Sequence, residues 1–364
     1  MSKNLEQIEK GFLVESHDGG NLQELLLLIQ SYYAEGDILN ESYLKWQYHG
    51  NPFGGPIMQI ARHVETGEVV GQYLVIPVNY TLRGNPIKGS LSLNTLTRPD
   101  FQGKGLFTTL ATSTYKQCLD IGIGLTIGFP NPNSLPGFLK KLNFKNTGSF
   151  TFLIRPLNFL GIAKDVFGNG MKSQRHGDDL EVARFEPIKF DNNVIVKEFD
   201  SGDYDSYTRF WTKASFGYSF TTHRTLDYLR WRYENIPTRK YKIIVISKDL
   251  EIQGLFVFRV KIMYGFKTVI LVDVVMLHEP TARSNVSEGI KSVISFYKKQ
   301  SINLAITLLN DKSFEFDILK SCGFKRIPQR MLPQKFPFIV RSHDSSQVPE
   351  FGETYLTFGD YDVL

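Results

Sequence analysis

The chain has 364 residues, 42% hydrophobic and 22% charged, which is typical of a globular protein with two domains. Its 42 Lys and Arg residues against 37 Asp and Glu give a net charge of +5, spread along the chain, which disfavours nucleic acid as a partner. The two cysteines, Cys118 and Cys322, lack metal-ligand spacing, so we expect no metal site and a reducing, cytoplasmic compartment. No signal-peptide layout and no membrane-length apolar run is found.

The chain contains an internal repeat. The segment YLKWQYHGNP at residues 43–52 recurs as YLRWRYENIP at 228–237, and each copy contains a tryptophan, Trp46 or Trp231. Further pairs follow in the same order, and they include FLKKLNFK at 138–145 and ILKSCGFK at 318–325. Because the spacing hardly changes along the chain, we predict that both copies hold the same elements in the same order.

The hydrophobic periodicity predicts an alternation of strands and helices in each copy. In chain order, the first copy has elements at residues 12–18, 22–35, 43–48, 58–64, 69–82, 89–97, 102–122, 125–130 and 138–145. The second copy has elements at 194–200, 204–215, 228–233, 241–247, 253–265, 269–277, 287–300, 304–310 and 318–325. Residues from about 155 to 192 carry turn and charge signals without a clear period, so we predict a connection that packs partly across the two halves.

The stretch QGKGLF at residues 102–107 lies between an apolar strand and a helix. Glycines let successive backbone amides converge, and the N-terminus of a helix favours negative charge, so the stretch predicts an anion site. An ordinary surface turn is the alternative. The second copy has PTARSNVS at 280–287, without glycine, and we therefore predict one anion site per chain.

This order of elements, with TLTRPDFQGKGLF at 95–107 and LTIGFPNPNS at 125–134, resembles the GNAT acyltransferase superfamily, whose members transfer acyl groups from coenzyme A to amines. One position departs from the family pattern, because Phe107 stands where glycine or alanine is usual. The resemblance implies an α/β (α+β) fold of two tandem GNAT-like domains, each a mixed, mostly antiparallel sheet flanked by helices. It implies an acyl-CoA-binding domain at 1–154, a connecting segment at 155–192, a degenerate GNAT-like domain at 193–345 and a C-terminal tail at 346–364.

The resemblance also implies a co-substrate, acetyl-CoA or another acyl-CoA. Its pantetheine arm would lie along the backbone of Thr95, Leu96 and Thr97, with Asn131 and Ser134 beyond the next strand. Its pyrophosphate would be bound by the glycine turn, and the residues concerned are Gln102, Gly103, Lys104, Gly105, Leu106 and Phe107, with Thr108 at the helix start.

Catalytic groups are harder to assign, because many relatives use a glutamate and a tyrosine that this chain lacks at the matching positions. We take Asn94, Tyr48 and His49 as candidates. His49 can titrate near neutral pH, with a structural turn histidine as the alternative. Asp273, which aligns with Asn94, is an acid in an apolar strand and is either paired or functional.

The resulting hypothesis is an N-acyltransferase that moves an acyl group to the amine of a small molecule, with a free or nucleotide-linked amino sugar as the favoured acceptor. A non-catalytic acyl-CoA-binding or scaffold protein is the alternative. An aminoacyl-tRNA-dependent transferase is disfavoured by the mild charge. The expected partners are coenzyme A and the amine, and the expected assembly is a monomer or homodimer.

Overall fold

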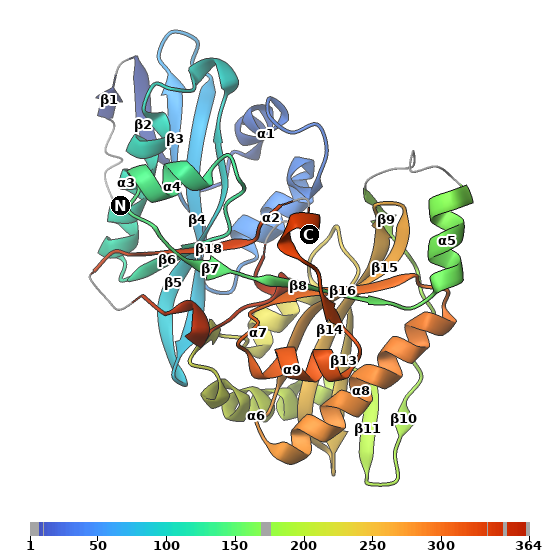
Figure 1. Cartoon of the computed structure of the whole chain (residues 1–364). Coiled ribbons are helices and arrows are strands. Elements are labelled where there is room, and N and C mark those ends of the chain that lie inside the picture. The colour runs from blue at the N-terminus through green and yellow to red at the C-terminus, as the bar shows by residue number, and fades with distance from the viewer. Residues whose placement is uncertain (1–6, 10, 169–175, 333, 345–347, 362–364) are drawn as a thin grey trace.

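Two mostly antiparallel sheets, each flanked by helices, form the framework of the protein (Figure 1). The computed structural model describes residues 7–9, 11–168, 176–332, 334–344 and 348–361. Parts of two predicted segments, residues 169–175 of the connection and residues 346–347 and 362–364 of the tail, therefore lie outside the described residues. The predicted fold class is confirmed.

Sheet A is built mainly from the first half of the chain. Its main path runs β1-β2-β3-β4-β5-β6-β18-β7, and β12 and β19 extend it beside β4. The strands are β1 (Gln7–Glu9), β2 (Phe12–His17), β3 (Ile57–His63), β4 (Val69–Leu82), β5 (Asn85–Thr97), β6 (Leu125–Gly128), β7 (Lys145–Ser149), β12 (Phe220–Thr222), β18 (Pro337–Ser342) and β19 (Thr354–Tyr355). Helices of this half are α1 (Leu22–Gln30), α2 (Glu41–His49), α3 (Leu106–Asp120) and α4 (Leu135–Lys141), with short turns η1 (Asp37–Leu39) and η2 (Pro99–Phe101).

Sheet B repeats this arrangement in the order β10-β11-β13-β14-β15-β16-β8-β17, with β9 beside β14. Its strands are β8 (Thr151–Pro156), β9 (His176–Asp179), β10 (Ile188–Lys189), β11 (Val194–Glu198), β13 (Lys242–Lys248), β14 (Glu251–Met263), β15 (Phe266–Met276), β16 (Leu304–Leu309) and β17 (Lys325–Arg326). Its helices are α5 (Phe159–Gly168), α6 (Tyr204–Ala214), α7 (Leu226–Leu229), the π-helical turn η5 (Arg230–Glu234), α8 (Pro280–Lys299) and α9 (Phe314–Ser321). Short turns are η3 (Ser201–Asp203), η4 (Ser215–Gly217), η6 (Gln329–Met331), η7 (Phe351–Glu353) and η8 (Phe358–Asp360).

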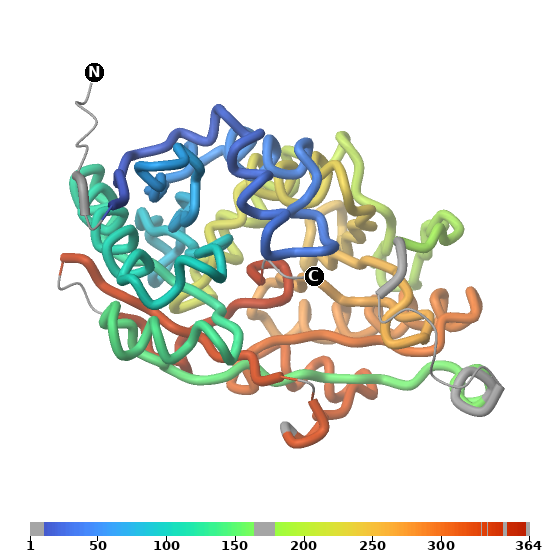
Figure 2. Tube along the Cα trace, turned by 90° about the horizontal axis from the view of Figure 1, so that it is seen from above, coloured from blue at the N-terminus to red at the C-terminus, as the bar shows by residue number. Residues whose placement is uncertain are grey.

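The two halves exchange one strand each. Strand β18 lies between β6 and β7 in sheet A, and β8 lies between β16 and β17 in sheet B. In Figure 2 the red segment that contains β18 runs beside the green strands of the first half, and the green segment that contains β8 runs on into the second. The predicted domain boundaries stay a prediction, but the sheets do not follow them, because a strand beginning at Thr151 pairs in sheet B.

A reciprocal tryptophan pair joins the halves. The indole rings of Trp46 and Trp231 stack with centroids 5.0 Å apart and planes 16° from parallel. Each indole N–H donates to the other residue's backbone carbonyl oxygen, at 2.7 Å from Trp46 and 3.1 Å from Trp231. Such a mutual contact is what a two-fold axis generates. The pair therefore marks a pseudo-two-fold axis that relates the two copies.

Sheet A carries a different apolar core on each face, because successive side chains of a strand point to opposite sides. On β4, Tyr73 and Val75 pack with the residues of α3 and α4, whereas Leu74 and Ile76 belong to a core that continues into the second half. Sheet A therefore packs against α3 and α4 on one face and, on the other, against a core that is shared with the second half. Within the described chain no helix is long and apolar enough to cross a membrane.

Candidate functional site

Strands β5 and β6 part at the centre of sheet A. They pair in parallel from Gly89 opposite Leu125 to Ser92 opposite Gly128, where β6 ends. Strand β5 continues to Thr97 with β4 as its neighbour on one side. We call the gap between residues 93–97 and the end of β6 the fork. The fork leaves one backbone edge of β5 open to an extended ligand, which could pair there as an added strand.

A β-bulge shapes the fork. The register between β4 and β5 shifts between Gln72 and Leu74, and Asn94 adopts a left-handed φ of +48°. The side-chain amide of Asn94 donates to Gln47 Oε1 at 2.7 Å and to the Tyr48 hydroxyl at 3.2 Å. The structure thus brings together two of the predicted catalytic residues, Asn94 and Tyr48, on the face of the sheet that turns toward α2.

Two buried polar atoms at the fork have no protein partner. Among the residues that the structure describes, Gln72 Oε1 and Thr95 Oγ1 are buried without a hydrogen bond. An unpaired buried polar atom costs about 1–3 kcal/mol, so such atoms usually mark a missing ligand or water. Thr95 is part of the β5 segment along which the predicted pantetheine arm would run, and the Gln72 side chain reaches β5 from β4, where it donates to the Asn94 carbonyl at 2.8 Å.

The glycine turn at residues 102–107 opens at the start of α3. Gly103 and Gly105 have φ values of +78° and +88°, and a Cβ built on either would meet no atom within 4 Å. Within the described part of the chain, no hydrogen bond is donated by the backbone amides of residues 103–107. These free amides at the N-terminus of a fifteen-residue helix are suited to a phosphate group.

Other predicted contact residues are engaged locally. The side chain of Gln102 donates to the Thr97 carbonyl at 3.2 Å, and the Lys104 ammonium lies 4.7 Å from the centre of the Phe101 ring. Asn131 Oδ1 accepts from the backbone N–H of Ser134 at 2.9 Å, so the pair shapes the start of α4. The backbone N–H of Thr108 donates to Gly105 and begins α3.

His49 lies away from the fork. Its Nε2 is 3.1 Å from the Gly19 carbonyl oxygen, and the residue is exposed at the end of α2. This contact matches the alternative of a structural turn histidine. The structure does not bring His49 together with Asn94 and Tyr48, and its catalytic role stays a prediction.

A tyrosine missed by the sequence reasoning reaches the fork from β4. The Tyr73 hydroxyl is 3.0 Å from Ser92 Oγ and forms a very short hydrogen bond with the Tyr115 hydroxyl. Ser92 is the last residue of β5 that pairs with β6, so this hydroxyl pair lies at the apex of the fork. Burial raises the pKa of Tyr73 well above its ordinary value, so the phenol keeps its proton. The family's tyrosine would align with Phe138 or Leu139, and the centre of the Phe138 ring lies 6.4 Å from that of Tyr73.

The described residues of the second half form no comparable opening. Its parallel pairing ends at Ile270 opposite Ile306, and the C-terminal segment 354–360 fills the space beyond. Thr357 bridges to Leu309, and Asn310 donates its side-chain amide to the Thr354 carbonyl at 2.8 Å. Residues 280–287, which stand at the glycine turn's position in the repeat, form the first turns of α8.

Asp273 is paired and buried. Arg224 Nε lies 2.8 Å from Asp273 Oδ2, and Arg224 Nη2 lies 2.7 Å from Asp360 Oδ2. The Tyr233 and Thr357 hydroxyls also donate to Asp273, at 2.8 Å and 3.0 Å. The contact of Tyr233 with Asp273 is the repeat's counterpart of the contact of Tyr48 with Asn94. Asp273 therefore holds the C-terminal segment in place and is not part of an open cleft.

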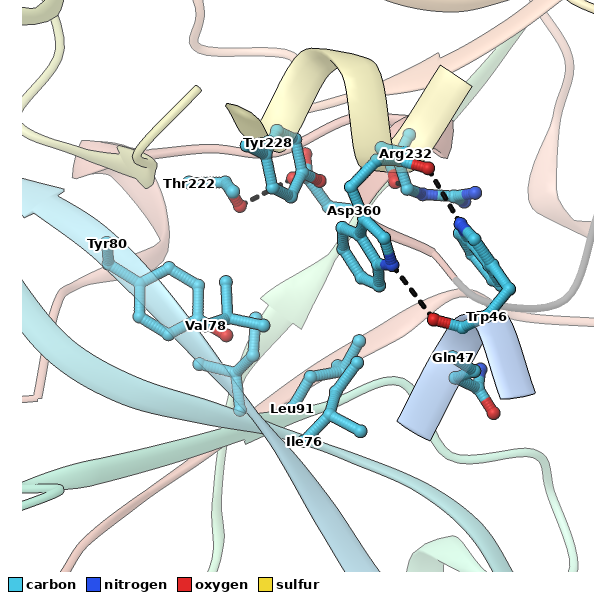
Figure 3. A pocket seen from close by; sticks show the side chains of 13 residues that line it. Trp46, Gln47, Ile76, Val78, Tyr80, Leu91, Thr222, Tyr228, Arg232 and Asp360 are labelled. Atoms are coloured by element: carbon cyan, nitrogen blue, oxygen red, sulfur yellow. Dashed lines mark hydrogen bonds between the residues drawn. The ribbon is translucent and has the colours of Figure 1, made fainter. Parts of the chain in front are cut away.

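A small cavity of about 30 Å³ lies between the halves, next to the fork (Figure 3). Ile76, Val78 and Leu91 line it from sheet A, and Trp46 lines it from α2. The described residues contain no cluster of three His, Cys, Asp or Glu side chains suited to a metal ion.

Comparison with known families identifies this architecture. Residues 54–146, which include the fork and the glycine turn, match the family model "Acetyltransferase (GNAT) domain". The fork and the glycine turn thus lie in a segment that is similar to a GNAT acetyltransferase domain. No curated protein matches the chain in sequence.

Solved structures share the fold over nearly the whole chain. A GCN5-related N-acetyltransferase from Anabaena variabilis is 13% identical with a TM-score of 0.62, over 91% of this chain and 73% of that one. The Saccharomyces cerevisiae N-myristoyltransferase with bound myristoyl-CoA is 14% identical with a TM-score of 0.60, over 93% and 80%. An Enterococcus faecalis protein described as a probable N-acyltransferase is 11% identical with a TM-score of 0.62, over 92% and 73%. At these identities the likeness establishes the fold.

Proposed function

We propose that the protein is an acyl-CoA-dependent N-acyltransferase with one coenzyme A site, in its first half. The observation that carries this proposal is the glycine turn, whose free amides stand beside a fork with two unpaired buried polar atoms. The match of residues 54–146 to a GNAT acetyltransferase domain supports the same reaction class.

The residues present fit coenzyme A in two parts. The amides of residues 103–107 would bind the pyrophosphate, because Gly103 and Gly105 leave the space above them open. The free edge of β5 at Thr95 to Thr97 would pair with the pantetheine arm, and Thr95 Oγ1 would gain a partner there. The second half offers neither feature, since α8 starts at Pro280 and the C-terminal segment fills the gap.

The chemistry requires two proton movements. A free alkylamine is mostly protonated at neutral pH and must lose a proton before its nitrogen attacks the thioester carbon. As the new C–N bond forms and the C–S bond breaks, the leaving thiolate takes up a proton. We propose that this is the proton lost by the amine, and that the Tyr73 hydroxyl, 3.0 Å from Ser92 Oγ at the fork, donates a hydrogen bond to the leaving sulfur.

Asn94 and Tyr48 would act on the opposite face of the fork. The Asn94 side-chain amide donates to the Tyr48 hydroxyl and to Gln47, and amide and hydroxyl groups can both donate and accept hydrogen bonds. We propose that they orient the acceptor amine. The acceptor itself would be a small molecule, and an amino sugar is the class we would test first.

Calorimetric titration of coenzyme A tests the proposal. We expect one site per chain in the wild type and loss of binding in a Gly103→Glu, Gly105→Glu variant, whose carboxylates would repel the pyrophosphate. A Gly67→Glu, Gly122→Glu variant is a matched control, because these glycines also have positive φ, +72° and +78°, and open space around Cβ. It should bind coenzyme A like the wild type.

The outcomes separate the competing functions. No binding to the wild type would reject the coenzyme A site altogether. Binding without thiol release from acetyl-CoA, across a panel of amino sugars and other amines, would favour a non-catalytic acyl-CoA-binding protein. Thiol release that depends on the amine would establish the transferase.

A further inference from the structure

A group of buried cations in the second half faces α2 of the first. It consists of Arg232, Arg239, Arg259 and Lys261, and we call it the basic cluster. We propose that the basic cluster binds a negatively charged group of the acceptor, so that the acceptor is an amine that also carries a phosphate or a carboxylate. This inference rests on the proposed function and adds the substrate class.

Two arginines of the basic cluster have unused N–H groups. Arg239 Nε donates to Asp37 Oδ2 at 2.5 Å, and Arg259 Nε donates to Asp179 Oδ1 at 2.7 Å. Among the described residues, the Nη1 atoms of both arginines are buried without a hydrogen bond. A guanidinium presents a planar fork of donors that suits two oxygens of a phosphate or carboxylate. Because unpaired buried donors are costly, these N–H groups indicate a missing acceptor.

The positive charge of the basic cluster exceeds the negative charge around it. Within the described part of the chain, its four cations form ion pairs with two carboxylates, Asp37 and Asp179. Arg232 donates to backbone carbonyls, at 2.9 Å to Gly359 and 3.5 Å to Tyr361, and its Cζ lies 5.9 Å from the centre of the Trp46 ring (Figure 3). The neighbouring network cannot neutralise it, because both of that network's carboxylates already pair with Arg224.

This excess charge shifts the pKa of nearby groups. Burial lowers the pKa of Lys261, and Arg259 and Arg239 lower it further. Burial alone would raise the pKa of Tyr241, but Arg232, Arg239 and Arg259 outweigh this effect, so that the pKa is lowered. Both shifts have the direction that a positive potential produces, and such a potential attracts an anion.

The fold itself does not require these cations. In the first copy of the repeat, Gln47 stands at the position of Arg232, and Gly54 stands at the position of Arg239. The first half forms the corresponding elements with these uncharged residues. Incompletely paired buried charges are a poor source of stability, so a ligand explains them better than the fold does.

The basic cluster is connected to the fork through α2. Arg239 Cζ lies 5.6 Å from the centre of the Tyr43 ring. The Tyr43 hydroxyl accepts from Gln47 at 3.4 Å, and Gln47 Oε1 accepts from Asn94 at the bulge. The side chain of Asp37 is 27% exposed, so the cluster can be reached from solvent beside it. An acceptor whose amine lies at Asn94 therefore extends along α2 toward Arg239.

Titration calorimetry on the full chain tests the basic cluster separately from the glycine turn. The probes are glucosamine, glucosamine 6-phosphate, muramic acid and uridine diphosphate-glucosamine, which compare no anion, phosphate, carboxylate and diphosphate on one amino sugar. They are titrated into the wild type saturated with coenzyme A and into the Gly103→Glu, Gly105→Glu variant, because in both the turn is closed to a second anion. In both we expect at least one charged probe to bind at least about tenfold more tightly than glucosamine.

Variants with opposite expected effects test the assignment of residues. Arg239→Gln should weaken binding of that charged probe at least about tenfold, whereas Asp37→Asn should strengthen it, because a competing carboxylate is removed. Lys261→Met also should weaken it, and makes the test if Arg239→Gln does not fold, because Lys261 forms no ion pair among the described residues. Lys267→Met is the matched control, since Lys267 is exposed, pairs with Ile262 and so lies on the other face of the sheet.

Kinetics connect the basic cluster to transfer. With acetyl-CoA, the charged sugar should have a kcat/KM at least about tenfold above that of glucosamine, and Arg239→Gln should abolish this preference by raising KM with kcat little changed. A purely structural role of Arg239 would affect both sugars equally, and such a result would overturn the inference.

The failures of the two proposals are distinguishable. Equal binding of glucosamine and all charged probes would overturn the basic cluster as an acceptor site, and so would binding that neither Arg239→Gln nor Lys261→Met changes. Failure of coenzyme A to bind, together with charged-probe binding that depends on Arg239, would reject the proposed transferase and leave the anion site in place.

Discussion

Replacing Arg224 by methionine should destabilise the protein strongly. Arg224 is 1% exposed and makes five hydrogen bonds. Two of these reach Asp273, one reaches Asp360 at 2.7 Å, and two reach Thr221 and the Thr222 carbonyl. Methionine fills a similar volume but leaves both carboxylates buried without a counter-charge. Breaking a buried ion pair in this way costs about 3–5 kcal/mol.

That free energy corresponds to a measurable shift in Tm. For 364 residues, an unfolding entropy of about 2.1 cal/mol/K per residue gives about 0.76 kcal/mol/K. The expected fall in Tm is therefore about 4–7 °C by scanning calorimetry at pH 7.5. Arg62→Met is the matched control, because the Arg62 side chain is 26% exposed and pairs with Glu15 and Glu24 near the surface. It should cost less than about 1 kcal/mol.

The effect should depend on pH in a defined direction. Burial raises the pKa of Asp360 above its ordinary value, while Arg224 opposes this increase. Without Arg224 the folded-state pKa rises further. A group whose pKa is higher in the folded state than in the unfolded state contributes its full stabilisation at pH values below its unfolded-state pKa. This stabilisation is lost as the pH rises through the folded-state pKa. Acidification from pH 7.5 to pH 5 should therefore reduce the difference in Tm between the Arg224→Met variant and the wild type.

A neutral version of the network separates charge from packing. The triple variant Arg224→Met, Asp273→Asn, Asp360→Asn contains no unpaired buried charge and should recover more than half of the lost stability. A Tm shift for Arg224→Met no larger than that of Arg62→Met would refute the reasoning. A shift that did not change with pH and was not relieved by the two asparagines would do so as well.

Three further predictions concern the fork and the contact between the halves. Tyr73→Phe should lower kcat for acetyl transfer about a hundredfold with the Kd for coenzyme A unchanged, because a hydrogen bond to the leaving sulfur is lost. Equal kcat in steady-state kinetics would remove Tyr73 from the chemistry. Trp46→Phe leaves the buried Trp231 carbonyl without its donor and should lower the free energy of unfolding, measured with denaturant, by about 1–3 kcal/mol. An unchanged midpoint and slope of the unfolding curve would contradict the assigned hydrogen bond. His49→Ala should change kcat less than twofold and the free energy of unfolding by less than about 0.5 kcal/mol, because the exposed imidazole contacts Gly19 and not the fork. A large loss of kcat would restore His49 as a catalytic residue.

The order of elements and the glycine turn could be predicted because local patterns determine them. The repeat of the Trp46 and Trp231 segments predicted the matching strands of the two sheets. Gly103 and Gly105 predicted positive φ values, which the structure shows. The lack of glycine at residues 280–287 predicted a difference between the halves, although these residues form a helix start rather than a turn.

Tyr73 could have been found with one further step. Strands β4 and β5 are joined by a two-residue turn at Arg83 and Gly84, both with positive φ. Counting back from such a turn places Val75 opposite Ser92, and alternation then puts Tyr73 and Ser92 on the same face. The register shift at the bulge comes later along β5 and does not disturb this pair.

The strand exchange and the C-terminal segment were beyond sequence reasoning. Short apolar runs such as those of β8 and β18 are consistent with strands but do not say which sheet receives them. Residues 354–361 contain no long periodic pattern, and we described them as part of a tail. The structure buries them, because Thr357 and Asp360 meet Arg224 and Asp273 in the second half. Such partners, distant in sequence, become visible only in three dimensions.

The exchange of β8 and β18 constrains how the chain can fold as it is made. Strand β18 fills the place between β6 and β7, although about 190 residues separate it from β7 in the chain. Until residue 342 has been synthesised, one edge of β6 is unpaired and β7 has no partner strand in the sheet. Open edges of this kind attract other strands and promote aggregation. The first half is therefore expected to mature only after the second has been translated, and to need protection by chaperones in the meantime.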